Sequence, residues 1–572
     1  MKTEDLLHIR RLNASFINQG REDHVLHDLN ITLRKGQTLG IVGESGSGKS
    51  VTSLSIMRLI PSPPINYPSG QILFEEEEID LLTTSEEKIR GLRGNRIAMI
   101  FQEPMTSLNP LKRCGKQVLE AILVHSSLDN SAARSQVIDL FQKVKLPDPE
   151  RAYSSYPHEL SGGQKQRVMI AMAISCSPDL LIADEPTTAL DVTVQKEILE
   201  LLQEIQENTG MSMIFISHDL GVVSKISDEL VVMHQGRIVE QGRSQDILDD
   251  PQDDYTKGLL NSRPPLRGRP ERLTTVSDYL EDTVREKEVD EETRIKRLGL
   301  IYSQQPLIRI SDLHTWYPIK KGILRKSVDH VKAVNGVTLD LFPRETLGVV
   351  GESGCGKSTL GRTIIGLEVP HSGSITYKGK ALSEMNSKER KTFTREVQMI
   401  FQDPYSSLNP RMSIGEAIKE PMEVYSLHPS SSHRKEKTLE LLEKVGLERN
   451  HYDRYPHEFS GGQRQRICIA RTLALEPEVI ICDESVSALD VSVQAQVLNL
   501  LNDLKGEFGL SYLFISHDLA VVRYMSDKVV VMNQGQIMEY EEADTLYSNP
   551  QHPYTEKLIS SIYTLDSDVS RS

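Results

Sequence analysis

The chain carries one ordered set of five short motifs twice. The first set begins with GESGSGKS at residues 43–50 and the second with GESGCGKST at residues 351–359, and each is followed by FQ(E/D)P, SGGQ, an apolar run ending in Asp-Glu, and ISHDL. The copies are 308 residues apart for the first motif (351 − 43) and 300 or 299 residues apart for the others (402 − 102, 460 − 161, 484 − 185 and 517 − 218). Because a nearly constant offset marks a duplicated unit, the sequence predicts two homologous domains of about 250 residues.

Changes in composition along the chain predict the domain boundaries. We expect the first domain at 6–260 and the second at 307–562, with a linker at 261–306 between them and a polar tail at 563–572. The linker begins with the Pro- and Arg-rich stretch NSRPPLRGRPERL and continues with VREKEVDEETRIKR, where both charges are dense. Mixed charge at this density predicts a solvated, partly helical tether and not a packed core.

Short β-like runs alternate with helix-like runs in the first domain. The β-like runs lie at 7–9, 37–42, 97–101, 180–183, 213–216 and 230–233, and residues 193–206 carry apolar side chains at helical spacing. This alternation predicts an α/β fold with a mainly parallel sheet. Between residues 102 and 161 the pattern becomes mostly helical, so we expect an inserted helical subdomain there.

Composition excludes several classes of protein. The chain of 572 residues has a net charge of −15, a mean hydropathy of −0.34, and five scattered cysteines without a CxxC pair. An acidic chain is a poor general nucleic-acid binder, so we expect no nucleic acid among its partners. The absence of a long apolar run and of an apolar signal core predicts neither a transmembrane helix nor a secretory signal.

The first motif fits the GxxxxGK(S/T) phosphate-binding loop, and it follows a predicted strand. Glycines let the backbone wrap a phosphate with its N–H groups pointing inward, and the helix that follows adds the positive end of its dipole. The Lys should reach the β- and γ-phosphates of ATP, and the Ser should bind Mg²⁺. The predicted ATP-binding residues of this motif are Gly43, Ser45, Gly46, Gly48, Lys49 and Ser50 in the first domain and Gly351, Ser353, Gly354, Gly356, Lys357, Ser358 and Thr359 in the second.

Polar residues at predicted strand ends supply the other catalytic groups. In each Asp-Glu pair, the Asp would hold Mg²⁺ and the Glu would take the proton of the attacking water. The His of ISHDL can touch the γ-phosphate, and the Gln of FQ(E/D)P can bind Mg²⁺. The predicted catalytic residues are Glu185, His218 and Gln102, and Glu484, His517 and Gln402. The predicted metal ligands are Ser50, Gln102 and Asp184, and Ser358, Gln402 and Asp483.

The SGGQ motif precedes a long predicted helix in each domain. A Ser hydroxyl and free backbone N–H groups at a helix N-terminus form a second phosphate-binding shape. Each domain then has two phosphate-binding motifs but needs only one nucleotide. This is explained if the domains meet face to face, so that each nucleotide contacts one motif from either domain. The predicted contacts are Ser161 and Gly163, and Ser460 and Gly462.

In this order, the five motifs resemble the Walker A, Gln-loop, LSGGQ, Walker B and His-switch motifs of the ATP-binding cassette ATPases. The resemblance covers nearly the whole chain outside the linker, and it implies tandem P-loop NTPase domains, each with a RecA-like, mainly parallel sheet core, a β-subdomain and a helical subdomain. It implies head-to-tail cassettes with two ATP sites, each completed by the SGGQ of the other cassette. The strings ALD at 189–191 and 488–490 match the D-loop that joins the two sites. Adenine should stack on Phe16 in the first cassette and on Tyr317 in the second, with Trp316 as an alternative.

Further strings resemble the peptide/nickel branch of bacterial importers. They are QEPMTSLNP, QDPYSSLNP, YPHEFSGGQRQR and the tail motif NPQHPYTEKL, whose first copy diverges to DDYT at 253–256. The fused arrangement and the string DESVSALD are most similar to glutathione-import ATP-binding subunits, with fused oligopeptide or microcin importers as neighbours. The implied function is an ATPase that couples ATP hydrolysis to uptake of glutathione or short peptides, with nickel or a metal chelate left open. Two permease subunits, an extracytoplasmic solute-binding protein and a peripheral place on the cytoplasmic face of the bacterial membrane are implied as well.

Departures from the family pattern leave every catalytic group in place. Val51 stands where Thr359 offers a hydroxyl, and Ser485 replaces the Pro186 of DEP. We therefore expect two competent sites. The alternative function is that of a soluble tandem-cassette translation factor, a class that shares the duplication but has a strongly basic, RNA-contacting linker. Here the linker is charge-balanced and the chain is acidic.

Overall fold

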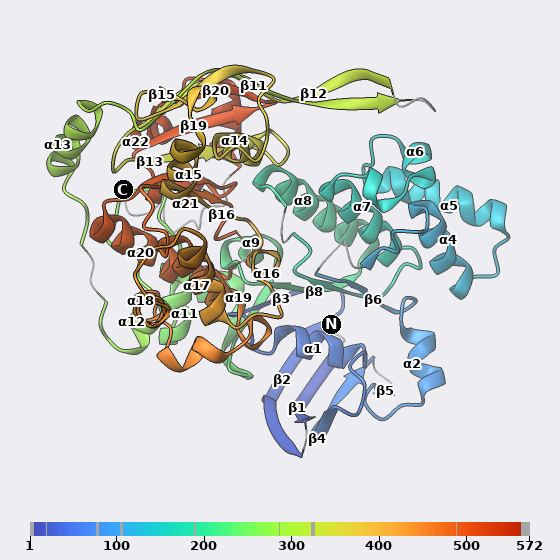
Figure 1. Cartoon of the computed structure of the whole chain (residues 1–572). Helices are drawn as coiled ribbons and strands as arrows, with labels where there is room; N and C mark the ends of the chain where they lie inside the picture. Colours follow the sequence, from blue (N-terminus) through green and yellow to red (C-terminus); the bar gives the residue numbers. More distant parts are fainter. Residues whose placement is uncertain are drawn as a thin grey trace.

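Two cassettes of the same architecture lie beside each other in the computed structural model (Figure 1). The structure describes residues 5–18, 20–75, 79–102, 107–187, 190–284, 287–321, 326–487 and 489–561. Within these ranges, no helix is long and apolar enough to cross a membrane.

A six-stranded sheet in the order β10-β9-β3-β8-β7-β6 forms the core of the first cassette. Its strands are β3 (Thr38–Val42), β6 (Ile97–Ile100), β7 (Leu180–Asp184), β8 (Ser212–Ser217), β9 (Glu229–His234) and β10 (Arg237–Arg243). All neighbouring strands are parallel except β9 and β10. Alternate residues of β7 join different apolar clusters, since Leu181 and Ala183 face one side of the sheet and Leu180 and Ile182 face the other. The predicted α/β fold with a mainly parallel sheet is confirmed.

An antiparallel β-subdomain and a helical subdomain flank this core. The β-subdomain is the sheet β2-β1-β4-β5, with β1 (Asp5–Asn18), β2 (Arg21–Arg34), β4 (Ile65–Phe74) and β5 (Ile79–Asp80). The predicted helical insertion contains α4 (Cys114–His125), α5 (Asn130–Lys143), α6 (Pro149–Ser154) and η1 (Pro157–Glu159), and α7 (Gly162–Ala173) follows it. The remaining helices are α1 (Lys49–Ile56), α2 (Glu86–Leu92), α8 (Val192–Thr209), α9 (Leu220–Ile226), α10 (Ser244–Asp249) and α11 (Asp254–Asn261).

The second cassette repeats this plan. Its core sheet, in the order β16-β17-β18-β13-β19-β20, contains β13 (Thr346–Val350), β16 (Val397–Ile400), β17 (Val479–Asp483), β18 (Ser511–Ile515), β19 (Lys528–Asn533) and β20 (Gln536–Glu542). Its β-subdomain contains β11 (Ile308–Lys321), β12 (Lys326–Leu341), β14 (Ser372–Tyr377) and β15 (Lys380–Ala381). Its helices are α14 (Lys357–Ile364), η2 (Leu382–Glu384), α15 (Ser387–Glu396), α16 (Pro404–Ser407), α17 (Ile414–Val424), α18 (Ser431–Lys444), η3 (Arg449–Asp453), η4 (Pro456–Glu458), α19 (Gly461–Leu473), α20 (Val491–Phe508), α21 (Leu519–Met525), α22 (Ala543–Ser548) and α23 (Pro553–Ser560).

The segment between the cassettes is partly helical but it is not a solvated tether. It contains α12 (Val276–Leu280) and α13 (Glu291–Tyr302). Leu273 is 2% exposed and belongs to the apolar core of the second cassette. The amide of Asn499 on α20 holds the backbone of Leu273 with two hydrogen bonds, at 2.9 Å to its N–H and 2.8 Å to its C=O. The expectation of a solvated segment is therefore wrong for these residues.

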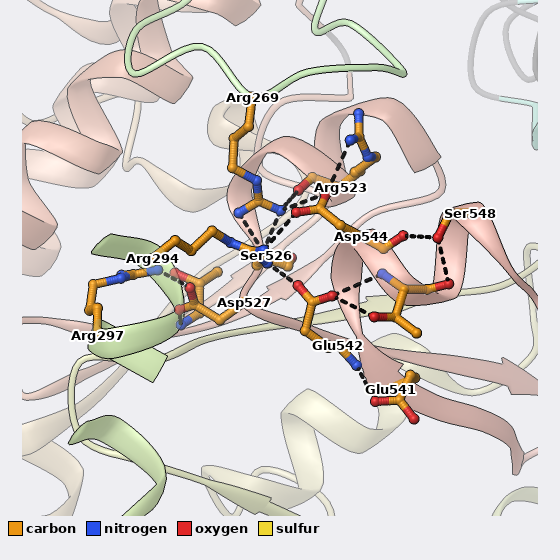
Figure 2. Close-up of polar contacts among 12 residues, drawn as sticks. Arg269, Arg294, Arg297, Arg523, Ser526, Asp527, Glu541, Glu542, Asp544 and Ser548 are labelled. Atoms are coloured by element: carbon orange, nitrogen blue, oxygen red, sulfur yellow. Dashed lines mark hydrogen bonds and ion pairs between the residues drawn. The ribbon is translucent and has the colours of Figure 1, made fainter. Parts of the chain in front are cut away.

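Arginines of the same segment bind carboxylates of the second cassette (Figure 2). Arg294 of α13 pairs with Asp544 at 2.8 Å, Arg269 approaches Asp544 at 3.6 Å, and Arg297 pairs with Asp527. These partners lie more than 200 residues away in the sequence, so the charge pattern of the segment alone could not reveal them. The dense charge of the segment serves docking and not only solvation.

Candidate active sites

Each phosphate loop joins a central strand to the helix that follows it. Residues 43–48 lie between β3 and α1, and residues 351–356 lie between β13 and α14. Gly43 and Gly351 each have a φ of 152°, and a Cβ at either position would meet a carbonyl oxygen at 2.2 Å, that of Met233 or Met532. Only glycine fits there, because the neighbouring strand approaches the loop so closely.

The lysine of each loop is buried inside it. Lys49 Nζ donates to the carbonyl oxygens of Gly43 at 2.7 Å and Glu44 at 2.8 Å. In the second cassette, Lys357 Nζ makes the same contacts at 2.7 and 3.0 Å. Burial lowers the pKa of Lys49, although nearby carboxylates oppose the shift. The loop thus places one ammonium group beside backbone N–H groups, an arrangement that suits phosphate binding.

Oxygen ligands suited to a hard cation meet at the end of β7 and of β17. Ser50 Oγ donates to Asp184 Oδ1 at 3.4 Å, and Ser358 Oγ donates to Asp483 Oδ1 at 2.7 Å. The second carboxylate oxygen of Asp483, Oδ2, is buried and has no hydrogen-bond partner among the described residues. Carboxylate and hydroxyl oxygens are ligands that Mg²⁺ accepts, and a buried carboxylate oxygen without a partner favours a bound cation. The residues therefore fit Mg²⁺.

Burial also affects the proton equilibria of these aspartates. Burial and the neighbouring charge of Glu185 raise the pKa of Asp184 to about 6. Burial likewise raises the pKa of Asp483. A cation bound beside these carboxylates would favour their charged form.

In each site, a Gln and a His side chain converge on one glutamate and form a triplet with it. Gln102 Nε2 donates to Glu185 Oε2 at 2.9 Å, and His218 Nδ1 lies 3.4 Å from the same oxygen. In the second cassette, Gln402 and His517 approach Glu484 Oε2 at 2.8 and 3.5 Å.

Both glutamates have a positive φ, 48° for Glu185 and 47° for Glu484, a conformation that is strained for a non-glycine residue. Such strain is retained where the surrounding structure holds a side chain in place for function.

Electrostatics within the triplets favour a charged glutamate. Although burial acts in the opposite direction, the hydrogen bond and charge of His517 lower the pKa of Glu484. Burial would lower the pKa of His218, but its hydrogen bond and charge interaction with Glu185 raise it overall. A glutamate held as a carboxylate can accept a proton from water, which is what a general base requires.

The SGGQ residues lie at the N-termini of α7 and α19. Ser161 Oγ accepts a hydrogen bond from the N–H of Gln164 at 3.3 Å, and Ser460 does the same for Gln463. A Cβ at Gly163 would lie 2.7 Å from a methyl group of Val194, so this turn packs tightly on α8. The two serines thus cap their own helices in this structure.

The D-loop aspartates connect the two cassettes at their phosphate loops. The N–H of Ser45 donates to Asp490 Oδ2 at 3.2 Å, and the N–H of Ser353 donates to Asp191 Oδ2 at 3.4 Å. Each cassette therefore places its D-loop beside the phosphate loop of the other, in a head-to-tail arrangement. Ala189 and Ala488 of the two ALD strings lie outside the described residues.

The predicted adenine-stacking residues lie on the first strand of each β-subdomain. Tyr317 of β11 interacts with the side chain of Thr359 at the start of α14. Trp316 instead stacks on His371 with a centroid separation of 4.2 Å. Since neighbouring residues of a strand point to opposite faces, this geometry favours Tyr317 over Trp316. Phe16 packs against the apolar cluster that also receives Val51.

Two tyrosines that sequence reasoning did not assign contact the phosphate loops. The N–H of Glu44 donates to the hydroxyl oxygen of Tyr255 at 2.9 Å, and the N–H of Glu352 donates to that of Tyr554 at 3.3 Å. Both tyrosines belong to the tail motif. The Tyr-Thr pair that both copies of this motif share is the sequence signal that could have identified them.

The divergent first copy of this motif keeps its local structure. Asp253 caps the N–H of Tyr255 at 2.9 Å, as His552 caps that of Tyr554 at 3.1 Å. An Asp in place of a His therefore preserves the same turn, because each offers one acceptor atom to the backbone.

Comparisons with known proteins show the family to which this chain belongs. A family model described as ABC transporter matches residues 26–188 and 334–487, and one described as Oligopeptide/dipeptide transporter, C-terminal region, matches residues 239–287 and 538–571. The glutathione import ATP-binding protein GsiA of Pectobacterium atrosepticum is 45% identical over 98% of this chain and 90% of its own length. Those of Salmonella typhimurium and Escherichia coli K12 are each 44% identical, over 99% and 98% of this chain and 91% and 89% of their own lengths. The chain therefore belongs to the ABC transporter ATP-binding protein family, and it carries two ATPase cassettes in one polypeptide.

Proposed function

We propose that this chain is the ATP-hydrolysing subunit of a bacterial importer for glutathione or short peptides. The proposal rests above all on one pairing: each complete catalytic set is joined to a tail of the oligopeptide/dipeptide transporter type, whose tyrosine contacts the phosphate loop. The names of the related glutathione import proteins support the same substrate class. Nickel or a metal chelate is the less favoured solute, because the matching tail model is described as oligopeptide/dipeptide and the relatives named above are glutathione import proteins.

The residues of each site have distinct roles in the proposed hydrolysis. Lys49 and the loop N–H groups hold the phosphates of ATP, while Ser50 and Asp184 ligate Mg²⁺. The bound Mg²⁺ neutralises charge on the phosphates. Glu185 accepts a proton from the attacking water, and Gln102 and His218 hold its carboxylate in place. Because the amide nitrogen of Gln102 donates to Glu185, its amide oxygen is left to approach the cation.

The second site assigns the same roles to its own side chains, namely Lys357, Ser358, Asp483, Glu484, Gln402 and His517. In the closed ATP-bound form, Ser460 and Gly462 would complete the first site, and Ser161 and Gly163 would complete the second. Phe16 and Tyr317 would stack on the two adenine rings.

Grooves beside the two Gln loops are suitable docking sites for permease subunits. The first, of about 530 Å³, is lined mainly by apolar side chains, including those of Met57, Leu59, Phe101 and Val124. The second, of about 310 Å³, includes Phe401 in its lining. Since Phe101 and Phe401 directly precede the two glutamines, movement in either site would reach the adjacent groove.

We therefore propose that a short cytoplasmic helix of one permease subunit binds in each groove. The chain then acts as a peripheral protein on the cytoplasmic face of the membrane, together with an extracytoplasmic solute-binding protein and without nucleic acid. The translation-factor alternative is not favoured, because the arginines of the inter-cassette segment bind carboxylates of the second cassette and a transporter tail follows each cassette.

Uptake measurements in a deletion strain test this function. We expect loss of labelled glutathione or dipeptide uptake, restored by the wild-type chain but not by a Lys49→Ala, Lys357→Ala double variant. The chain should also co-purify with two membrane proteins from detergent-solubilised membranes. Unchanged uptake of glutathione, peptides and nickel, or fractionation of the chain with ribosomes, would refute the proposal.

A further inference from the structure

The segment that leaves the first cassette contacts the His-bearing loop of that cassette. Arg263 lies two residues after the end of α11, and its guanidinium pairs with Asp219 Oδ1 at 3.2 Å. Asp219 directly follows His218 and caps α9 by accepting a hydrogen bond from the N–H of Gly221 at 2.8 Å. Both partners are mostly buried, with side-chain exposures of 24% for Arg263 and 23% for Asp219. Partial burial makes this pair more effective than an exposed one, because water screens it less.

The second cassette has no arginine at the equivalent position. The repeat offset of 299 residues aligns Ser262 with Ser561 (561 − 262) and therefore Arg263 with Ile562. Asp518 caps α21 as Asp219 caps α9, accepting from the N–H of Ala520 at 2.9 Å. The structure of Ile562 lies outside the described residues, but an aliphatic side chain cannot pair with a carboxylate. The two His-bearing loops therefore differ in one charged contact.

The same segment then reaches the corresponding helix of the second cassette. Arg523 of α21 donates to the carbonyl of Pro265 at 3.2 Å. Arg269 donates to the carbonyls of Arg523 at 2.7 Å and Ser526 at 3.0 Å (Figure 2). Arg269 lies six positions after Arg263, a stretch that spans at most about 22 Å. Residues 263–269 thus link α9 of one cassette to α21 of the other.

A small cavity between the cassettes lies at this link. It has a volume of about 110 Å³, and its lining includes Arg263, His218 and Asp219 from one side and His517 and Asp518 from the other. Arg263 therefore lies next to both His-bearing loops, and its guanidinium pairs with Asp219 of the first.

We infer that Arg263 is a positioning residue for the first ATP site. Its ion pair fixes Asp219, and with it the backbone of His218, so that the imidazole stays within reach of Glu185. In the second cassette, the corresponding loop is held by its helix cap and by the hydroxyl of Tyr547, which donates to the carbonyl of Leu519 at 2.6 Å, and not by an arginine at the position aligned with Arg263. The two sites therefore turn over at different rates when this contact is lost, although both catalytic sets are complete. The inference rests on the proposed roles of Glu185 and Glu484.

Phosphate-release bursts from the purified full-length chain can separate the two sites. With Glu484→Gln the first burst after mixing with Mg-ATP reports on the first site, and with Glu185→Gln it reports on the second. We expect Arg263→Ala to slow the burst about tenfold in the Glu484→Gln background, a barrier increase of about 1.4 kcal/mol. The burst in the Glu185→Gln background and the Kd for ATP should stay unchanged.

Three further variants separate positioning from folding. Arg263→Lys keeps the charge and should restore most of the burst rate, whereas Arg263→Gln should not. Arg272→Ala removes an exposed ion pair with Asp503 from the same segment and should have no effect on either burst. Equal slowing in both backgrounds, or no slowing in either, overturns the positioning role. Normal steady-state ATPase activity in the two single glutamate variants would instead refute the catalytic roles on which the inference rests.

Discussion

At the scale of residues, the contacts around the glutamates of the two candidate sites have nearly the same lengths. The Gln-to-Glu contacts differ by 0.1 Å between the sites (2.9 and 2.8 Å), and so do the His-to-Glu contacts (3.4 and 3.5 Å). The replacement of Thr359 by Val51 leaves these contacts in place. Equal geometry leads to the expectation that both sites contribute to turnover.

Removal of either general base should slow ATP turnover strongly. Glu185→Gln and Glu484→Gln each replace a carboxylate with an amide that cannot take a proton from water, and such a loss typically costs about 100-fold or more. ATP binding should survive, because the phosphate loops remain intact. Steady-state ATPase assays and nucleotide-binding titrations check this. Near-normal ATPase activity of either variant in the assembled transporter would show that the sites are unequal.

The raised pKa of Asp184 predicts a pH dependence of nucleotide binding. Since Mg²⁺ needs the charged carboxylate, affinity for Mg-ATP at the first site should rise with pH up to about 6 and then level off. Below this pH, binding should release a proton from Asp184, and this release should become smaller as the pH rises above about 6. The folding stability of the nucleotide-free protein should depend on pH in the opposite direction. A pKa raised above its unfolded value contributes stability at low pH that is lost as pH rises through about 6.

Calorimetric titration of the Glu484→Gln variant with Mg-ATP near pH 6, in two buffers of different ionisation enthalpy, measures the released protons. Asp184→Asn should bind weakly at the first site and show a smaller release, because Asp483 of the second site, whose pKa is also raised, can still release a proton. An affinity that does not vary between about pH 5 and pH 7 would contradict the predicted pKa effect.

At the scale of elements, the segment between the cassettes is a docked part of the second one. Leu273 is inserted into the second core, and Arg294 binds Asp544 at 2.8 Å. These contacts hold the segment on both sides of a possible cut at Thr275. A chain break there should therefore be tolerated because both halves of the segment stay bound to the second cassette.

We expect the fragments 1–275 and 276–572 to co-purify and to retain substantial transport when expressed together. The first fragment keeps Arg269 and Leu273, which bind the second cassette. Burial of a leucine side chain contributes about 2 kcal/mol, so Leu273→Asp in the first fragment should weaken co-purification, while Arg272→Ala should not. Complete loss of transport by two folded, associated fragments would contradict this view.

At the scale of the whole molecule, the cassettes meet through two related contacts. Asp490 reaches the phosphate loop of the first cassette, and Asp191 reaches that of the second. Each candidate nucleotide site therefore includes a contact from the other cassette, and we expect movement of one cassette to alter the site of the other. A transporter also needs this motion to reach the membrane, through surfaces beside the Gln loops.

An exposed aromatic residue on such a surface should be needed for coupling. Tyr405 of α16 is 55% exposed and stacks under Arg464 at 5.2 Å. Tyr405→Arg should abolish transport while it leaves ATP binding intact, because the new charge opposes docking of an apolar helix. The aligned residue in the first cassette, Met105, lies outside the described residues. We expect Met105→Arg to have the same effect.

Phe508→Arg provides the matched control for this change. Phe508 is 44% exposed at the C-terminal end of α20, on the side of the sheet where the parallel strands begin. It should leave both transport and ATPase activity unchanged. Transport by Tyr405→Arg at the wild-type rate would exclude this surface as the permease contact.

The sequence could predict which side chains lie together in each candidate site, because each motif lies at the end of a local pattern. Apolar runs identify the parallel strands, and the carboxyl ends of such strands meet at one edge of the sheet. Asp184, Gln102 and His218 follow three of these runs, and the structure brings the three side chains together around Ser50 and Glu185. The duplication could be recognised as well, because the motifs keep nearly the same spacing in both copies.

The sequence by itself determined the two cassettes, their α/β fold and which residues are candidates for each site, because strand and helix patterns act over a few residues. Only the tertiary structure decided where the inter-cassette segment lies, since Arg263 and Arg269 find their partners 44 residues and more than 250 residues away. It also decided that Tyr255 and Tyr554 contact the phosphate loops. Such contacts depend on packing between distant segments, which no local pattern of charge or hydrophobicity encodes.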